Sequence, residues 1–142
     1  MADVFPTVIS GVVVYVVGQV ALKLLIEPVQ ELKKTIGAIS HALIERANVI
    51  YNPGAFNKEI ANETSRELRK LAARLKSHLR LIPVYRRTAQ LFWLPALADI
   101  QKAHKALIGL SNGVLETEPG FPQFNHKNIN DLCESLHIDN PG

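Results

Sequence analysis

The stretch from Val4 to Leu22 contains no charged residue, and it constrains the fold more than any other part of the chain. About 20 apolar residues in helical form are enough to span the hydrocarbon core of a bilayer. Lys23 follows directly and can extend its charged end to the interface along its aliphatic stem. The run therefore predicts a transmembrane helix over residues 4–26, followed by a separate domain over residues 27–142.

Two other structures would account for the same run. A secretory signal needs a positively charged start and a small-residue cleavage site, which neither the acidic start at Asp3 nor the end from Val20 to Lys23 provides. A buried helix of a soluble protein would have to be covered on every side by a chain of 142 residues, of which 20% are charged. We therefore expect a retained anchor.

The basic residues beside the span predict its orientation. None precedes it, whereas Lys23, Lys33 and Lys34 follow within the range over which cytoplasmic flanks gather positive charge. The single cysteine, Cys133, agrees with a reducing compartment, because small domains in oxidising compartments more often carry cysteine pairs. We expect the N-terminus outside and the C-terminal domain in the cytoplasm.

Small side chains share one face of the predicted span at helical spacing. Such residues allow close approach of helix backbones in lipid, where packing drives association. Glycine is also common in membrane helices for other reasons. The sequence predicts self-association through a small-residue face made of Thr7, Ser10, Gly11, Val14, Gly18 and Ala21.

Residues 27–142 suffice for one small domain, and their apolar periodicity is helical throughout. The pattern predicts long helices over 28–51, 57–82 and 95–114, with Asn57 capping the second and Gly109 marking close packing in the third. A short C-terminal helix should begin at Asn125 or Asn128. The predicted fold class is all-α: an N-terminal transmembrane helix leading into an antiparallel bundle.

The segment 83–95 lies where the second helix would return to the membrane surface. Aromatic rings and cationic stems are typical of the headgroup level. Phe92 and Trp93 could instead close the end of the bundle, and both roles are compatible. The predicted interface consists of Lys23, Tyr85, Arg86, Arg87, Phe92 and Trp93.

Polar side chains recur along the first cytosolic helix towards its membrane-distal end, where the start of the second helix and the end of the third also lie. Convergent amide, hydroxyl and guanidinium groups could receive a polar or anionic ligand there, and a solvated face with ordinary caps is the alternative. This candidate ligand pole consists of His41, Glu45, Asn48, Asn52, Asn62, Arg66, Ser111 and Asn112.

Basic residues outnumber acidic ones between Arg66 and Arg87, where Glu67 is the only acid. Contact with anionic lipid is the simplest interpretation for the membrane-proximal members of this run. Nucleic acid is not the preferred partner, because the aromatic residues cluster at one bend and do not interleave along a groove. A solvated face that complements the helix dipole is the third possibility.

No phosphate-binding loop, dinucleotide-binding glycine pattern, zinc-protease motif or paired-cysteine spacing occurs. We therefore expect no metal, no cofactor and no enzymatic activity. Arg74 and His78 lie one helical turn apart, which resembles the Arg-to-His pattern of HEPN-type ribonucleases, although the spacing here is shorter.

Residues 26–54 and 106–114 (ALIGLSNGV) resemble an uncharacterised group of small bacterial membrane-anchored helical proteins. This resemblance implies the bacterial inner membrane and supplies no activity. A span followed by a helical cytosolic bundle is also similar to membrane effectors of bacterial antiviral systems, which assemble into rings or pores when a signal arrives.

Three functional hypotheses follow. The first is a non-enzymatic, membrane-tethered homo-oligomer that serves as a scaffold or interaction protein, with the bilayer, other copies of itself and an unknown cytosolic protein as partners. The second is a pore-forming or membrane-disrupting effector of antiviral defence, because Ser10, Tyr15 and Gln19 place polar groups in the span. The third is a sensor that binds a soluble ligand at the candidate ligand pole.

Overall fold

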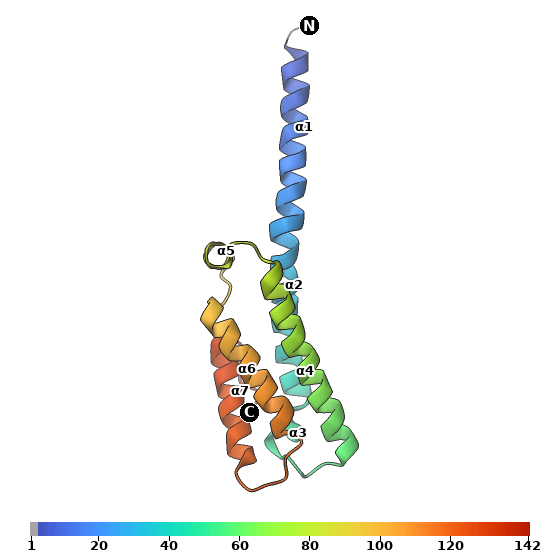
Figure 1. Cartoon of the computed structure of the whole chain (residues 1–142), viewed down its shortest axis with the longest axis vertical. Helices are drawn as coiled ribbons and strands as arrows, with labels where there is room; N and C mark the ends of the chain where they lie inside the picture. Colours follow the sequence, from blue (N-terminus) through green and yellow to red (C-terminus); the bar gives the residue numbers. More distant parts are fainter. Residues whose placement is uncertain (1–2) are drawn as a thin grey trace.

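The computed structural model describes residues 3–142, and all of its regular elements are helices. Helix α1 (Val4–Ala21), a π-helical turn η1 (Leu22–Ile26) and α2 (Glu27–Glu45) form one continuous helix of 42 residues. Its N-terminal part stands clear of the other helices, as Figure 1 shows, and no residue of α1 is buried. The expected all-α class, with an apolar N-terminal helix leading into packed helices, is confirmed.

The C-terminal half of this long helix packs into an antiparallel bundle. Helix α2 lies against α4 (Lys58–Leu81), α4 against α6 (Leu97–Gly113), and α6 against α7 (Phe121–Leu136). Each helix buries one apolar stripe, and burial of each large aliphatic side chain contributes about 1.5–3 kcal/mol. The fully buried aliphatic residues are Leu32, Ile39, Leu43, Ile50, Leu68, Leu75, Ile100, Leu107, Leu110, Val114, Ile129 and Leu132.

Local sequence features determine the connection between α2 and the next long helix. Helix α2 ends at Glu45, because Arg46 leaves helical geometry, and a separate short helix α3 (Ala47–Tyr51) follows. The expected single helix over 28–51 is therefore interrupted. The chain then turns at Gly54, whose φ is 85°. As predicted, Asn57 caps the next helix: its side-chain oxygen accepts a hydrogen bond of 2.9 Å from the backbone N–H of Ile60.

The start of the last helix differs from the prediction. Helix α7 begins at Phe121, directly after Gly120 in the left-handed region and with a proline in its first turn. Asn125, an expected N-cap, is instead a buried residue within the helix, and Asn128 follows it one turn later along the same helix. The expected start was wrong because both amides serve tertiary packing rather than capping.

The pair α6 and α7 packs closely through two glycines. A Cβ atom on Gly109 would lie 2.9 Å from the side-chain nitrogen of Asn128, and one on Gly113 would lie 1.9 Å from the side-chain oxygen of Asn125. Side chains at these positions would push the two helices apart. The close packing expected at Gly109 is confirmed, and Gly113 extends it by one turn.

The segment between α4 and α6 contains a short helix that sequence periodicity did not reveal, α5 (Tyr85–Phe92). Figure 1 shows it nearly end-on, lying across the end of the bundle from which α1 projects. The bundle is thus closed by α5 at the end that faces the apolar helix, and the α3–α4 loop lies at the opposite end.

Candidate functional site

Helix α5 is held between two left-handed residues. Val84 before it has a φ of 46° and Trp93 after it a φ of 52°, although neither is glycine. The hydroxyl of Thr88 donates to the carbonyl of Pro83 at 2.9 Å, and the N–H of Leu94 donates to the carbonyl of Ala89 at 2.9 Å. A β-branched residue rarely adopts this conformation, so the surrounding contacts impose it.

Tyr85 anchors α5 to the bundle. Its ring is buried, and its hydroxyl donates a hydrogen bond of 2.7 Å to the carbonyl of Pro95. Burial raises the pKa of Tyr85 to about 12, with the Asp99 carboxylate as a second cause. Tyr85 was predicted to face the membrane interface, and this is wrong: its aromatic body completes the core because its polar end finds a partner inside.

The outer surface at this end of the molecule is apolar and cationic. Trp93 is 91% exposed, Val84 69%, Leu91 67% and Leu81 60%. Exposed apolar patches of this kind occur at sites that bind other proteins, membranes or ligands. The exposed cations next to them in the chain are Arg80, Arg86 and Arg87, and Lys23 is exposed in η1.

Phe92 and Trp93, predicted as a pair, take different roles. Phe92 is half-buried and packs against the core, so it does close the bundle end. Trp93 points away from the core at 91% exposure and therefore closes nothing. Closure of the bundle end therefore applies to Phe92 alone, and the membrane-interface role of Trp93 stays a prediction.

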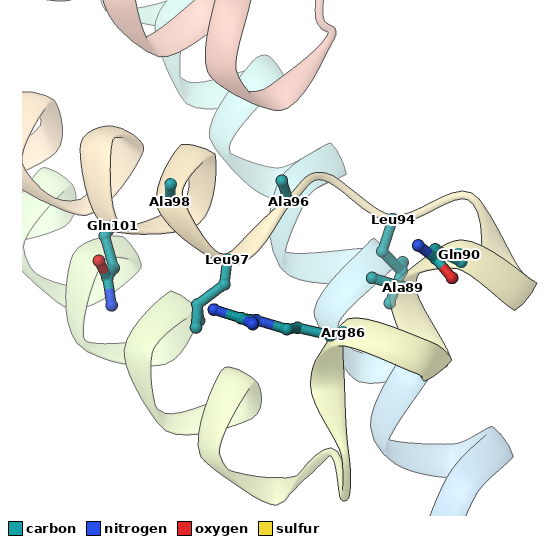
Figure 2. A pocket seen from close by; sticks show the side chains of 8 residues that line it. All are labelled: Arg86, Ala89, Gln90, Leu94, Ala96, Leu97, Ala98 and Gln101. Atoms are coloured by element: carbon teal, nitrogen blue, oxygen red, sulfur yellow. The ribbon is translucent and has the colours of Figure 1, made fainter.

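An open pocket of about 560 Å³ lies between α5 and the start of α6, and Figure 2 shows its lining. Arg86 extends from α5 towards Leu97 at the start of α6, with Gln90 and Gln101 on either side. Leu94 and several alanines contribute the apolar part of the wall. A single guanidinium beside an apolar wall suits an amphiphilic anion better than a fully polar solute.

A second groove of about 370 Å³ runs between α4 and α6 and shares Gln101 with the first pocket. Lys76, Arg80 and Lys105 line it. His104 also lines it, and burial and the nearby Lys76 lower the pKa of this imidazole. No carboxylate lines either cavity.

The chain has no relative among the proteins it was compared with. No family model, no curated protein and no solved structure matches it. The resemblance to small bacterial membrane-anchored proteins therefore stays a prediction, and the site has to be argued from its own geometry.

The small-residue face of α1 is open along its length. A Cβ atom added to Gly11 or Gly18 would have nothing within 4 Å. The hydroxyl of Thr7 donates to the carbonyl of Asp3 at 2.8 Å, and that of Ser10 to the carbonyl of Pro6 at 2.7 Å. Both hydroxyls are thus satisfied within the helix, which makes the face compatible with lipid or with another helix.

The eight residues of the candidate ligand pole do not converge on one of the cavities described here. His41 pairs with Glu45 at 3.7 Å on an exposed surface and lines a groove of about 370 Å³ between α2 and α4. Ser111 is buried, and its hydroxyl donates to the carbonyl of Ile108. The amide of Asn52 donates to the carbonyl of Asn48.

The remaining pole residues also have separate surroundings. The side-chain oxygen of Asn112 accepts from the guanidinium of Arg69 in α4. Arg66 is exposed and Asn62 half-buried on α4. These local partners are those of helix ends and helix surfaces, so the geometry offers a solvated face here rather than a pocket.

Arg46 is a polar residue of this distal half that sequence patterns did not single out. Its guanidinium donates to Glu67 at 3.0 Å and to Glu63 at 3.2 Å, which fastens the break after α2 to α4. The only signals in the sequence were one arginine, Arg46, and two acids, Glu63 and Glu67, which lie one helical turn apart in the next predicted helix. Such spacing is too common to identify a partner in another helix.

Arg74 and His78, which resemble a ribonuclease motif, both lie on the side of α4 that faces α2. Arg74 is exposed and lines the groove between α2 and α4. Nδ1 of His78 lies 2.8 Å from the hydroxyl oxygen of Thr35, and that hydroxyl gives its proton to the carbonyl of Glu31. The contact between the imidazole of His78 and the hydroxyl of Thr35 ties α4 to α2. Within residues 3–142 no cluster of three metal-ligating side chains occurs either.

Proposed function

We propose that this protein is a membrane-tethered, non-enzymatic homo-oligomer of the bacterial inner membrane that serves as a scaffold or interaction protein. The observation that carries this proposal is the helix Val4–Glu45, which is uncovered over α1 and buried on one face over α2. A helix that is apolar on all sides and uncovered by its own chain needs lipid or other helices around it.

The continuity of this helix supports a mechanical role. Because η1 joins α1 to α2 without a loop, a rotation or displacement of the span carries α2 with it, and α4 packs directly on α2. Association of the spans would therefore arrange the bundles relative to one another. The basic residues that follow the span support an orientation with these bundles in the cytoplasm and the N-terminus outside.

Self-association is proposed through the small-residue face. Gly11 and Gly18 present bare backbone with open space above them, which permits close helix contact. The hydroxyls of Thr7 and Ser10 are already paired with their own backbone. Two such faces can meet without leaving a polar group unpaired in lipid.

The decisive experiment measures the subunit number of the full-length protein in nanodiscs by mass photometry and crosslinking. Gly11→Leu with Gly18→Leu should abolish the oligomer, because two isobutyl groups separate the backbones. Val13→Leu with Val20→Leu, on the opposite face of α1, is the matched control and should leave it intact. Unchanged crosslinking of the glycine variant would refute this interface, and a monomeric wild type would refute the homo-oligomer.

A pore is the second candidate function, and Gln19 favours it. This amide lies in the span beside Val20, Lys23 and Leu24, where the helix surface is hollowed, and it makes no hydrogen bond within residues 3–142. Amides in lipid seek partners on neighbouring helices or water in a channel. Conductance of planar bilayers that is lost in Gln19→Leu would support a pore; a closed bilayer with an intact oligomer leaves the scaffold.

A further inference from the structure

We propose that the groove formed by α4, α5 and α6 binds the headgroup of an anionic phospholipid, with Lys76, Arg80, Arg86 and Lys105 holding the phosphate oxygens. This inference rests on the membrane attachment proposed above and adds a specific lipid site to it. The groove consists of the two adjoining cavities that share Gln101.

The charge of the groove is uncompensated. Among the described residues none of its four cations forms an ion pair, whereas Lys102 on the same helix α6 is paired with Asp131 and Glu134 of α7. Asp99 lines neither cavity, and its carboxylate acts on Tyr85. Four neighbouring cations without a carboxylate repel one another, and an anion between them removes this repulsion.

The cations come from three different helices and line one surface. Lys76 and Arg80 lie one turn apart on α4, Lys105 faces them from α6, and Arg86 extends from α5. Lys76 is close enough to His104 to act on its pKa, which shows that the two sides of the groove approach each other. Lysine and arginine donors arranged around a gap are the groups that bind phosphate oxygens.

The wall chemistry selects a lipid among phosphate compounds. The cavity at Arg86 is walled by Ala89, Leu94 and Leu97, which can accept acyl carbons or the glycerol backbone. No phenyl, phenol or indole ring lines either cavity, and the imidazole of His104 is the one aromatic ring there, so little surface is offered for the stacking that nucleobases favour. An anion with an apolar body fits this combination.

The position of the groove also suits a lipid. Figure 1 shows α5 at the end of the bundle from which α1 projects, and the end of α4 and the start of α6 adjoin it. The apolar cavity beside α5 is therefore nearest to the bilayer, and the cationic groove between α4 and α6 extends away from it. A phospholipid would bind with its acyl chains towards the bilayer and its phosphate towards Arg80 and Lys76.

The test uses two triple variants of the full-length protein with equal change of charge. The groove variant is Lys76→Gln, Arg80→Gln, Arg86→Gln. The control variant is Lys33→Gln, Lys34→Gln, Arg87→Gln, which removes three exposed cations that do not line the groove. Lys33 and Lys34 adjoin Thr35, which contacts His78 between Lys76 and Arg80, so they lie at the same level of the bundle as the groove. Arg86 and Arg87 are neighbours at the same depth, so this pair separates a site from a diffuse surface charge.

The measurement is the thermal midpoint of each protein in neutral detergent, titrated with phosphatidylglycerol, cardiolipin, phosphatidylcholine or inorganic phosphate. We expect saturable stabilisation of the wild type by the two anionic lipids. The groove variant should need roughly a hundredfold more lipid, since each cation near an anionic lipid contributes about 1 kcal/mol and 1.4 kcal/mol is tenfold. The control variant should bind as the wild type does.

Each other outcome overturns the proposal in a distinguishable way. Equal loss in both variants would mean diffuse electrostatic attraction without a site. Equal stabilisation by inorganic phosphate would mean a soluble anion as ligand. Parallel reconstitution into nanodiscs tests the lipid site and the membrane attachment separately. A protein that inserts but is stabilised equally by anionic and neutral lipids contradicts the lipid site alone. A protein that does not insert contradicts membrane tethering. Circular dichroism without lipid verifies that both variants fold.

Discussion

The side-chain amide of Asn125 in α7 donates a hydrogen bond of 2.9 Å to the backbone carbonyl of Ile50 in α3. Both residues are fully buried. Ile50 lies in the last turn of α3, where carbonyl groups have no partner within the helix. One side chain of the last helix thus completes the end of a helix that lies 75 residues earlier in the chain, and it closes the bundle at the end opposite α5.

Asn125→Ala should lower the free energy of unfolding by about 1–3 kcal/mol, because the Ile50 carbonyl stays buried and loses its donor. Gln123→Ala, at an exposed position of the same helix, should change it by less than about 0.5 kcal/mol. Denaturant titration of the full-length protein in detergent, followed by circular dichroism, measures both. Equal effects of the two substitutions would show that the amide contributes nothing specific.

Gly113→Ala should destabilise the bundle by about 1–3 kcal/mol, because the added methyl group would lie 1.9 Å from the oxygen of Asn125 and force α6 and α7 apart. Gly37→Ala is the matched control, since nothing lies within 4 Å of a Cβ there, and it should stabilise α2 by up to about 1 kcal/mol.

Denaturant titration of the double variant Gly113→Ala, Asn125→Ala tests the contact between these two positions directly. Removing the Asn125 amide makes room for the methyl group, so the two effects should sum to less than their separate values. Strict additivity would show that the contact between these residues is not what separates the helices.

The parts of the fold that the sequence predicted are those with a local cause. Asn57 forms a cap with its own helix, and Pro83 ends α4 through its own ring, so neither depends on distant residues. The apolar run before Lys23 is equally self-contained. Helical periodicity then located the buried stripes of α2, α4 and α6.

The errors arose where distant contacts override local preference. Asn125 has the residue type of a cap, and only the carbonyl of Ile50 makes a buried position favourable for it. Tyr85 has the composition of a membrane interface, and only the carbonyl of Pro95 makes burial favourable. Helix α5 is flanked by Val84 and Trp93, both in the left-handed conformation. Glycine or asparagine at these positions would have indicated the helix ends in the sequence.

The candidate lipid groove was only half visible in the sequence. The basic run indicated anionic lipid, and it included Lys76, Arg80 and Arg86. Lys105 belongs to a different helix, and no pattern along one helix can show which charges face each other across a groove. The packing of α6 on α4 supplies that information.

Tyr85 should make stability depend on pH in the alkaline range. The unfolded side chain ionises near pH 10, whereas burial raises the pKa of Tyr85 in the folded protein to about 12. Because the folded state favours the neutral phenol, this contribution to stability is complete below about pH 10 and is lost as pH rises towards 12. Stability of the wild type should therefore fall over this range.

Tyr85→Phe is the variant that checks this. It should cost about 1 kcal/mol at neutral pH, because the hydrogen bond to Pro95 is lost. It should also remove the part of the alkaline dependence that comes from Tyr85 and leave the part from Tyr51 and Cys133, because burial raises the pKa of each of these two groups as well. The difference in phenolate absorbance between the wild type and Tyr85→Phe, recorded together with unfolding curves, isolates this tyrosine from Tyr15 and Tyr51. An unchanged pH profile in Tyr85→Phe would assign the alkaline loss to other groups.

Trp93 is the only tryptophan of the chain, so its fluorescence reports one position. Its indole is 91% exposed beside α5 and should lie in the headgroup region once α1 is inserted. In nanodiscs, lipids brominated near the headgroup should quench this emission strongly, and acrylamide in the water should quench it weakly.

The matched control moves the indole to the other end of the bundle, with Phe56→Trp in a Trp93→Phe background. Phe56 lies in the loop between α3 and α4, so the moved indole should respond to acrylamide and ignore brominated lipid. Quenching of Trp93 only from the water would place α5 away from the bilayer, and it would remove the geometric basis of both the predicted interface and the lipid groove.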